Sequence, residues 1–220
     1  MGDRLLGQKR YAPYKDPLVI FCIIIAFLLV CIGLFTTRYV GIYVNGSSMS
    51  PTLTGAPESS SGEAMPGGDY LYADTYALPD RGDIVVVLPE NTSRYIIKRV
   101  IALGGDEIYM SRGVVYLKTA GTEQFFALEE DYVLDEQNDP DLPYNSYRSE
   151  DDPLVVPEGH MFVLGDNRGY RDGNEIIFSN DSRRYGTFSY DSLVGVIADW
   201  SLAMKGFFSP IYNFLRFGIY

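Results

Sequence analysis

The residues that could carry out chemistry in this sequence are few, and one of them is a serine in a restricted turn. Ser48 lies in the segment GSSMSP (residues 46–51), where small residues precede it and Pro51 limits the backbone that follows. A turn of this kind exposes the serine hydroxyl, and an exposed hydroxyl acts as a nucleophile when a nearby base accepts its proton. An ordinary serine-rich turn has the same composition, so the residues around Ser48 must decide between the two.

Lys98 is a candidate for that base because of its place in the segment YIIKRVIALGGD (residues 95–106). Side chains alternate between the two faces of a strand, so Lys98 shares a face with the apolar Val100 while Arg99 points the other way. Burial among apolar side chains disfavours the ammonium form and can lower a lysine pKa by several units from its ordinary value near 10.4. A solvated surface lysine is the alternative, and it is the commoner case for a lone lysine on a strand.

Other bases and nucleophiles are scarce. His160 is the only histidine, which excludes a histidine-rich metal site, and the sequence contains neither an HExxH motif nor a G-x-S-x-G elbow. A Ser-His-Asp triad built on His160 is the alternative, and we expect His160 to be structural. Both cysteines, Cys22 and Cys31, fall inside an apolar segment, so the rest of the chain has no cysteine nucleophile and no disulfide. We expect no metal and no other cofactor.

That apolar segment predicts a membrane anchor. Residues 18–35 read LVIFCIIIAFLLVCIGLF, without a charge or a proline, which is near the lower length limit for a helix that crosses a bilayer. We predict a transmembrane helix over residues 18–36, between a basic N-terminus (1–17) and an outer domain (37–220). The alternative is a cleaved signal peptide, whose apolar run is shorter and ends in a small-x-small site that is missing here.

Charge is distributed unevenly around this segment. Residues 1–17 carry four basic and two acidic side chains, a balance of +2, so the net charge of −11 leaves −13 for the remainder. Basic flanks stay on the cytoplasmic side of a cell membrane, which predicts that the acidic remainder lies on the outer side. A surface this acidic repels phosphate backbones, so nucleic acid is not an expected partner, whereas membrane lipid is.

The remainder predicts a mainly β fold with one antiparallel domain. Short runs rich in β-branched and aromatic residues are separated by glycine and proline breaks. They lie at residues 39–44, 84–88, 95–103, 114–117, 161–164 and 193–198. Inserted loops are expected at 54–68, 129–152 and 169–178, the second of them acidic and solvated. A calcium loop at 135–141 is disfavoured, because Pro140 interrupts the ligand spacing and the required glycine is missing.

The C-terminal run from Trp200 to Tyr220 is dense in aromatic residues. Lys205, Pro210 and Arg216 interrupt it, so it is not a second membrane span. Aromatic side chains are favoured at a lipid interface, and they also pack readily into protein cores. The sequence leaves both interpretations open.

Several segments, in this order, resemble the conserved boxes of bacterial signal peptidase I, a serine–lysine peptidase family. They are SMSPTL (48–53), RGDIVVV (81–87), YIIKRVIALGGD (95–106), GHMFVLGDNR (159–168) and SNDSR (179–183). Together with the N-terminal anchor, the similarity covers most of the chain. It implies a membrane-bound hydrolase with one transmembrane helix and an antiparallel β-barrel-like catalytic domain.

The resemblance also implies roles for individual residues. Ser48 would be the nucleophile, with its backbone N–H in the oxyanion hole, Lys98 the general base, and Ser179 the residue that orients the lysine. Asp181 and Arg183 match charged positions that support the site. The positions that match the family's substrate pockets are Val44, Met49, Leu53, Val86 and Ile97, beside a strand at 42–46 along which an extended substrate would pair.

Two insertions depart from the family pattern. Residues 54–68 lengthen a link that is usually short. Residues 169–178 separate GDNR from Ser179 by ten residues, where the family has a much shorter link. The position of Ser179 therefore depends on the path of that insertion.

The resemblance implies that the substrates are secretory preproteins, cut at the small-x-small site that follows their apolar segment. Two alternatives differ in class. A self-cleaving repressor of the related serine–lysine group would need a DNA-binding domain in place of the anchor. An inactive, membrane-anchored binding module that keeps the fold is the other, and the presence of both Ser48 and Lys98 argues against it.

Overall fold

The computed structural model describes residues 16–57, 63–90 and 92–218, which form two units that meet between Arg38 and Tyr39. In the first unit, helix α1 (Pro17–Arg38) has 22 residues and no buried side chain. Its length is about 33 Å, and it is apolar along nearly all of it, so it is a candidate membrane span. The predicted basic N-terminus lies outside the described residues, apart from positions 16 and 17.

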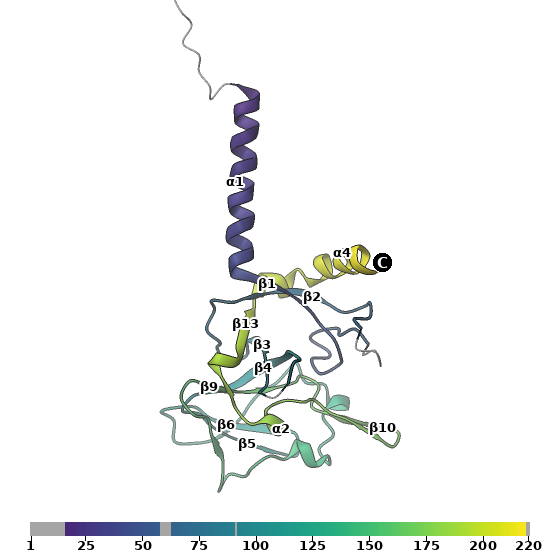
Figure 1. Ribbon diagram of the computed structural model, residues 1–220. Coiled ribbons are helices and arrows are strands. Elements are labelled where there is room, and N and C mark those ends of the chain that lie inside the picture. Colours follow the sequence, from purple (N-terminus) through teal and green to yellow (C-terminus); the bar gives the residue numbers. More distant parts are fainter. Residues whose placement is uncertain (1–15, 58–62, 91, 219–220) are drawn as a thin grey trace, which may run out of the picture. The chain divides into compact units, whose positions relative to one another are not determined.

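The second unit is built on one large sheet, shown in Figure 1, in which every pair of neighbouring strands is antiparallel. The mainly β, antiparallel fold predicted from the sequence is therefore confirmed. In spatial order its strands are β1 (Tyr39–Tyr43), β2 (Tyr70–Asp74), β13 (Leu193–Ile197), β3 (Ile84–Val87), β4 (Ile96–Leu103), β9 (His160–Leu164) and β12 (Phe188–Ser189). Strand β4 lies in the interior of the sheet, between β3 and β9.

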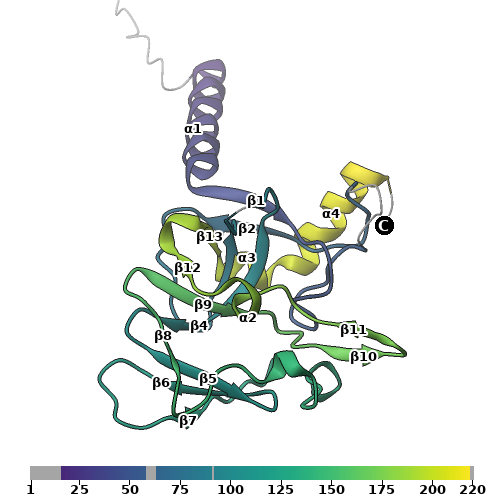
Figure 2. The same cartoon turned by 60° about the horizontal axis from the view of Figure 1, so that its bottom comes forward.

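A smaller sheet covers part of β4 and β9, as Figure 2 shows. Its strands are β7 (Phe126–Ala127), β6 (Val114–Lys118), β5 (Glu107–Ser111) and β8 (Leu154–Val155), and a separate hairpin is formed by β10 (Tyr170–Asp172) and β11 (Glu175–Ile177). Ile101 and Phe162 from the large sheet pack with Ile108 and Leu117 from the small one in a fully buried cluster. Burial of these side chains joins the two sheets.

Each β-branched run predicted from the sequence lies on a strand. The strands that the sequence did not predict are shorter or more polar, and among them β2 and β5 are the longest. Strand β2 reads YLYAD and β5 reads EIYMS, with one β-branched residue between them, so they lack the Val- and Ile-rich signal of β3 and β4.

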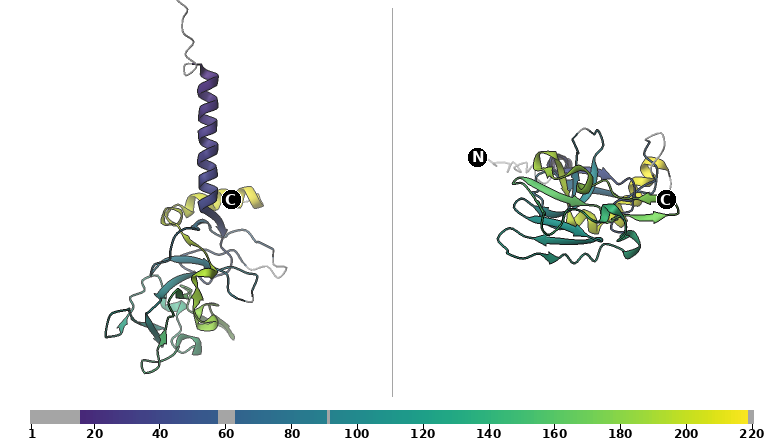
Figure 3. Two further views of the ribbon diagram at one scale, coloured as in Figure 1. Left: turned by 60° about the vertical axis from the view of Figure 1, so that its left-hand side comes forward. Right: turned by 90° about the horizontal axis from the view of Figure 1, so that it is seen from below.

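The described part of the second unit also has three α-helices: α2 (Ser182–Tyr185), α3 (Asp199–Ala203) and α4 (Lys205–Phe217). The sequence analysis predicted no helix at the C-terminus, so α4 is an addition to it. Pro210 inside the helix lowers its intrinsic propensity, and contacts with β2 compensate for this. Helix α4 and the smaller sheet lie at opposite ends of this unit (Figures 1 and 3).

The cluster between the sheets gives a stability prediction. Leu117→Ala should lower the free energy of unfolding by about 2–5 kcal/mol, because the fully buried leucine leaves a cavity. Val114→Ala in the same strand should cost less than about 1 kcal/mol, because Val114 is exposed. Denaturant unfolding of the full chain in detergent measures both, and equal losses would contradict the packing described here.

Candidate active site

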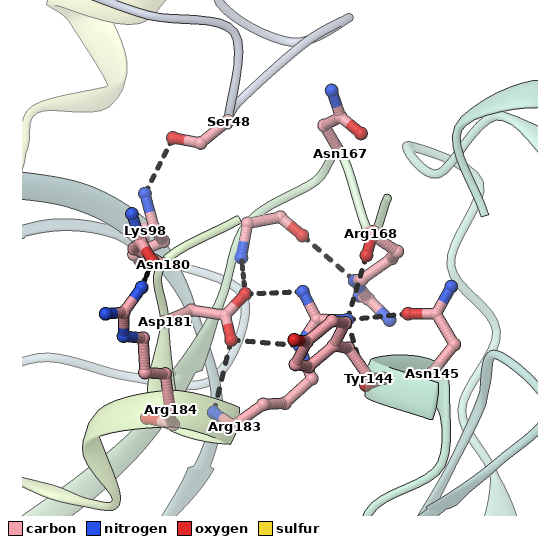
Figure 4. Close-up of polar contacts among 12 residues, drawn as sticks. Ser48, Lys98, Tyr144, Asn145, Asn167, Arg168, Asn180, Asp181, Arg183 and Arg184 are labelled. Carbon is pink, nitrogen blue, oxygen red and sulfur yellow. Dashed lines mark hydrogen bonds and ion pairs between the residues drawn. The ribbon is translucent and has the colours of Figure 1, made fainter. Parts of the chain in front are cut away.

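Figure 4 shows the side chains of Ser48 and Lys98 pointing toward each other, and both residues line one groove. Ser48 lies in the turn after β1 and Lys98 lies in the middle of β4. The Nζ atom of Lys98 is 2.7 Å from Ser48 Oγ and 2.7 Å from the carbonyl oxygen of Ile97. Two groups separated by fifty positions in the chain are thus within hydrogen-bonding distance, which is the geometry that a nucleophile and its base require.

The Lys98 side chain is almost completely buried, with 2% of its surface exposed. Burial lowers the pKa of Lys98 to about 8, since an ammonium ion loses most of its hydration in this position. Asp181 and Asp166 oppose this shift, and Arg183 adds to it. A substantial fraction of the amine is therefore neutral near pH 8, and only the neutral amine can accept a proton.

The turn that carries Ser48 is fastened by the segment after β9. The backbone N–H of Asn167 donates to the Ser48 carbonyl oxygen at 3.1 Å, and its side-chain amide donates to Ser47 O at 3.3 Å. Gly165 allows the two segments to approach, because a Cβ atom there would lie 2.5 Å from Ser48 O and closer still to Ser179 Oγ. The described residues offer no acceptor to the backbone N–H of Ser48, which is left available to a ligand.

Arg99, next to Lys98 on β4, faces the other way, as strand alternation predicts. Its guanidinium group binds both carboxylate oxygens of the buried Asp166, at 2.9 and 2.6 Å. It also donates to Thr52 Oγ1 at 3.3 Å. One arginine thus links β4, the segment after β9 and the turn that contains Ser48.

Asp181 and Arg183 form a second buried ion pair. Arg183 donates to the two oxygens of Asp181 at 2.9 and 2.8 Å. Asp181 also caps helix α2 by accepting from the Arg183 backbone N–H at 3.1 Å, and it accepts from Gly165 N–H at the same distance. Asp181 and Arg183 are thus paired with each other, and the bond from Gly165 to Asp181 connects the pair to the segment that lies against the Ser48 turn.

The segment 129–152 was expected to be a solvated acidic loop, and the structure corrects this expectation in part. Most of its acids are exposed, but the segment also supplies partners to the three arginines behind the site. Glu130 forms an ion pair with the fully buried Arg168, and the Tyr132 ring lies under Arg99, 3.9 Å from its centroid. Arg183 donates to Asn145 Oδ1 at 2.6 Å and to Tyr144 O at 3.3 Å. A buried charge is destabilising unless it is paired or hydrogen-bonded, and the segment 129–152 provides these interactions for the three arginines.

Ser179 is buried beside Gly165, and its hydroxyl makes no hydrogen bond within the described part of the chain. It borders a cavity of about 390 Å³ whose other lining residues are Tyr144, Phe178, Arg183 and Arg184. The rings of Tyr144 and Phe178 are stacked, with centroids 4.5 Å apart. The insertion at 169–178 projects as the β10–β11 hairpin, so Ser179 stays near the turn, although it is not hydrogen-bonded to Lys98.

The groove has a volume of about 1320 Å³ and runs along β1, the nucleophile turn and the start of β4. Four of the five residues predicted to form substrate pockets line it: Val44, Met49, Val86 and Ile97. The fifth, Leu53, packs in the apolar cluster that includes Val44, Met49 and Val86, and it does not reach the groove. The floor of the groove is therefore apolar.

His160 lies at the start of β9, with Nδ1 3.2 Å from the carbonyl oxygen of Glu158. It contacts neither Ser48 nor Lys98 in the described structure. Within residues 16–57, 63–90 and 92–218, no group of three or more His, Cys, Asp and Glu side chains is arranged to hold a metal ion. Among the described residues, Lys98 is the titratable side chain that is hydrogen-bonded to Ser48.

Comparison with known proteins identifies the family. The family model for "Signal peptidase, peptidase S26" matches residues 16–200. The chain belongs to the S26 signal peptidase family. It is accordingly a hydrolase, a serine peptidase of the signal peptidase type.

Relatives of this S26 peptidase come from bacteria and from plant mitochondria. Signal peptidase I U of Bacillus subtilis is 29% identical over 198 residues, which cover 89% of this chain and 91% of the relative. The mitochondrial ATP-independent inner membrane protease subunit 1b of Arabidopsis thaliana is 33% identical over 167 residues, covering 73% and 69%. A crystal structure of a signal peptidase I from Enterococcus faecalis is 26% identical, covers 56% of this chain and 98% of the other, and superposes with a TM-score of 0.39.

Some residues around the site in this S26 peptidase were not predicted as site residues. Asp166, Asn167 and Arg168 belong to the segment GHMFVLGDNR, which marked their importance but not their contacts. Glu130 and Asn145 carry no sequence signal, because they lie among many other polar residues in 129–152. Their partners are distant in the chain, so only the fold reveals them.

The Glu130–Arg168 pair gives a prediction about stability. Glu130→Ala should lower the free energy of unfolding by about 3–5 kcal/mol, because it leaves the fully buried Arg168 guanidinium without its counter-ion. Glu129→Ala, at the exposed neighbouring position, should change it by less than about 0.5 kcal/mol. Denaturant unfolding measures both variants. A loss for Glu130→Ala no larger than that for Glu129→Ala would show that the pair is dispensable.

The lowered pKa of Lys98 makes stability depend on pH. Between pH 8 and 10.5 the unfolded chain binds a proton at Lys98 that the folded chain has released, so stability rises with pH across this window. The total rise is about 3 kcal/mol, at about 1.4 kcal/mol per unit. Lys98→Met should abolish this rise, and Ser48→Ala should retain it. Unfolding at pH 7.5 and pH 10 tests this, and an identical rise in Lys98→Met would rule out the assignment.

Proposed function

We propose that this S26 peptidase is a membrane-bound serine endopeptidase that removes N-terminal signal peptides from secretory preproteins by means of a Ser48–Lys98 dyad. The observation that carries the proposal is the 2.7 Å separation between Ser48 Oγ and the Nζ atom of a buried lysine. The name of the relative from Bacillus subtilis agrees with signal peptidase activity.

The chemistry follows from the protonation state of Lys98. In the neutral state its amine accepts the proton of Ser48 Oγ as the oxygen attacks the scissile carbonyl carbon. The resulting oxyanion lies beside the backbone N–H of Ser48, which stabilises it. Lys98 then passes the proton to the departing amine, which leaves an acyl ester on Ser48. Water, deprotonated by Lys98, attacks this ester, and Lys98 returns that proton to Ser48 Oγ as the ester bond breaks, which releases the signal peptide and restores the serine hydroxyl.

Ser179 completes the dyad in this proposal. Its buried hydroxyl has no protein partner among the described residues, so it is free to accept a hydrogen bond from Lys98 when the substrate tightens the site. Asp181 accepts a hydrogen bond from Gly165, which lies beside Ser179, and Arg183 holds Asp181 in place through their ion pair. They act as positioning residues, since neither of them contacts Ser48.

The groove suits an extended peptide with small side chains. Val44, Met49, Val86 and Ile97 form its apolar floor, and Leu53 supports this floor from behind. The backbone groups of Val44 and Gly46 already bond to Asp69 and Ala56, so a substrate strand would pair with the groups of Asn45, which lies between them. Within the strand 42–46 that was predicted to pair with the substrate, we therefore expect Asn45 to supply the backbone hydrogen bonds.

We assign the same membrane topology that the charge pattern predicts. The segment 1–17 is cytoplasmic, residues 18–36 span the membrane as part of α1, and residues 37–220 form the extracytoplasmic catalytic domain with insertions at 54–68, 129–152 and 169–178. The 22-residue apolar helix and the excess of basic residues before it support this assignment. It brings the catalytic domain to the membrane surface where the cleavage sites of preproteins emerge.

Two substitutions test the dyad against an inactive binding module. Ser48→Ala and Lys98→Ala should each lower the rate of preprotein cleavage by at least about 10³-fold, because each removes one half of a unit that acts together. Ser47→Ala changes the exposed neighbouring serine and should retain nearly full activity. Cleavage of a preprotein by the purified full chain in detergent provides the measurement. Full activity in either dyad variant would refute the mechanism, and no activity in the unmodified protein would favour the binding module.

A further inference from the structure

Helix α4 is polar on the side that faces the protein. Ser209 and Asn213 are both buried, and both are hydrogen-bonded to the segment before β2. Asn213 donates to Gly68 O at 3.0 Å and accepts from the Tyr43 hydroxyl at 3.0 Å. Ser209 accepts from the Tyr70 backbone N–H at 2.9 Å. These bonds determine which side of the helix faces the sheet.

The opposite side of α4 is apolar and exposed. Residues two positions apart on a helix lie about 200° apart around its axis, so the residues two positions before or after the buried ones point away from the sheet. Phe207, Ile211 and Leu215 have 57%, 43% and 77% of their surface exposed. A helix on the surface of a water-soluble domain has the reverse arrangement, with its apolar side buried. An apolar stripe directed outward indicates a non-aqueous partner.

The position of α4 in the chain points to lipid as that partner. The candidate span α1 ends at Arg38, and the next residue, Tyr39, contacts the Trp200 ring of α3 with centroids 5.4 Å apart. Helix α4 begins two positions after α3 ends, with only Met204 between them. If α1 crosses a bilayer, chain connectivity therefore keeps the start of the C-terminal helices at its surface.

Charge supports the same partner. Residues 200–218 contain the cations Lys205 and Arg216 and no acid, whereas the chain after residue 17 has a net charge of −13. Lys205 Nζ lies 3.4 Å from Asp69 Oδ2, so Arg216 is the cation that anionic headgroups attract, while they repel most of the remaining surface. Helix α4 is about 20 Å long and carries both cations, so it fits the plane of the interface and not a second span.

We propose that α4 lies in the outer interface of the membrane, with Phe207, Ile211 and Leu215 among the acyl chains. This inference rests on the proposed anchoring by α1 and is independent of the proposed chemistry. Lys205 Nζ on the same helix donates to Thr52 O at 2.6 Å, four residues after Ser48. Membrane contact through α4 thus sets the depth at which the nucleophile turn meets a substrate that leaves the bilayer.

The test uses the full chain in vesicles of phosphatidylcholine and phosphatidylglycerol. The readout is tryptophan fluorescence. Trp200 is the only tryptophan, so Trp200→Phe removes the background signal, and Leu215→Trp then adds a probe on α4. Phe126→Trp, on β7 at the other end of the unit (Figure 2), is the exposed control. Bromine on the acyl chains should quench the probe at position 215 several-fold more than the control, and aqueous iodide should quench only the control. Ser48→Ala should leave this pattern unchanged.

Two results would overturn the proposal. Iodide quenching at position 215 equal to that at 126 would place α4 in water. Shielding of position 215 from both quenchers would assign the stripe to a protein partner, including a second copy of this chain. If Trp200→Phe fails to fold, a second variant that retains Trp200 repeats the measurement. It carries a polarity-sensitive label on Leu215→Cys, with Cys22 and Cys31 replaced by serine. A chain that does not float with the vesicles would instead disprove the anchoring by α1.

Discussion

A lysine amine buried in the interior of a sheet is the constraint on which the rest of the site depends. Burial disfavours the charge of Lys98, and this tendency survives only if the carboxylates nearby are already neutralised. The structure provides a separate arginine for each of them: Arg99 binds Asp166 and Arg183 binds Asp181. Either carboxylate, left unpaired, would stabilise the ammonium form and return the pKa toward its ordinary value. The two ion pairs thus keep the pKa of Lys98 low, so that part of the amine is neutral and able to accept a proton near neutral pH.

The same requirement accounts for the segments that surround the catalytic sheet. The two arginines that neutralise these carboxylates are themselves largely buried and need further partners. The segment 129–152 supplies Tyr132 to Arg99 and Asn145 to Arg183, and its Glu130 pairs with a third buried arginine, Arg168, so an apparent insertion is a structural part of the site. Gly165 permits the close approach that joins this polar layer to the nucleophile turn. Asn167 then holds that turn in place through two hydrogen bonds.

The sequence predicted features that have a local physical signature, and it did not predict those that depend on distant partners. Alternation along β4 was sufficient to predict the opposite directions of Lys98 and Arg99, because strand geometry is periodic. No local pattern marks Glu130 among its acidic neighbours, and its role appears only when the fold brings Arg168 against it. Helix α4 escaped prediction because a surface helix normally buries its apolar side, whereas here Ser209 and Asn213 face the sheet.

The central claim is that Lys98 is the neutral proton acceptor for Ser48. The most direct test is an NMR titration of the Lys98 side chain in the full protein, labelled at Cε and assigned with Lys98→Met, alongside the pH dependence of kcat/KM. The account predicts that Lys98 titrates with a pKa of about 8 and that the acidic limb of kcat/KM has the same midpoint. A Lys98 that titrates near 10.5, or an acidic limb unrelated to its titration, would contradict it.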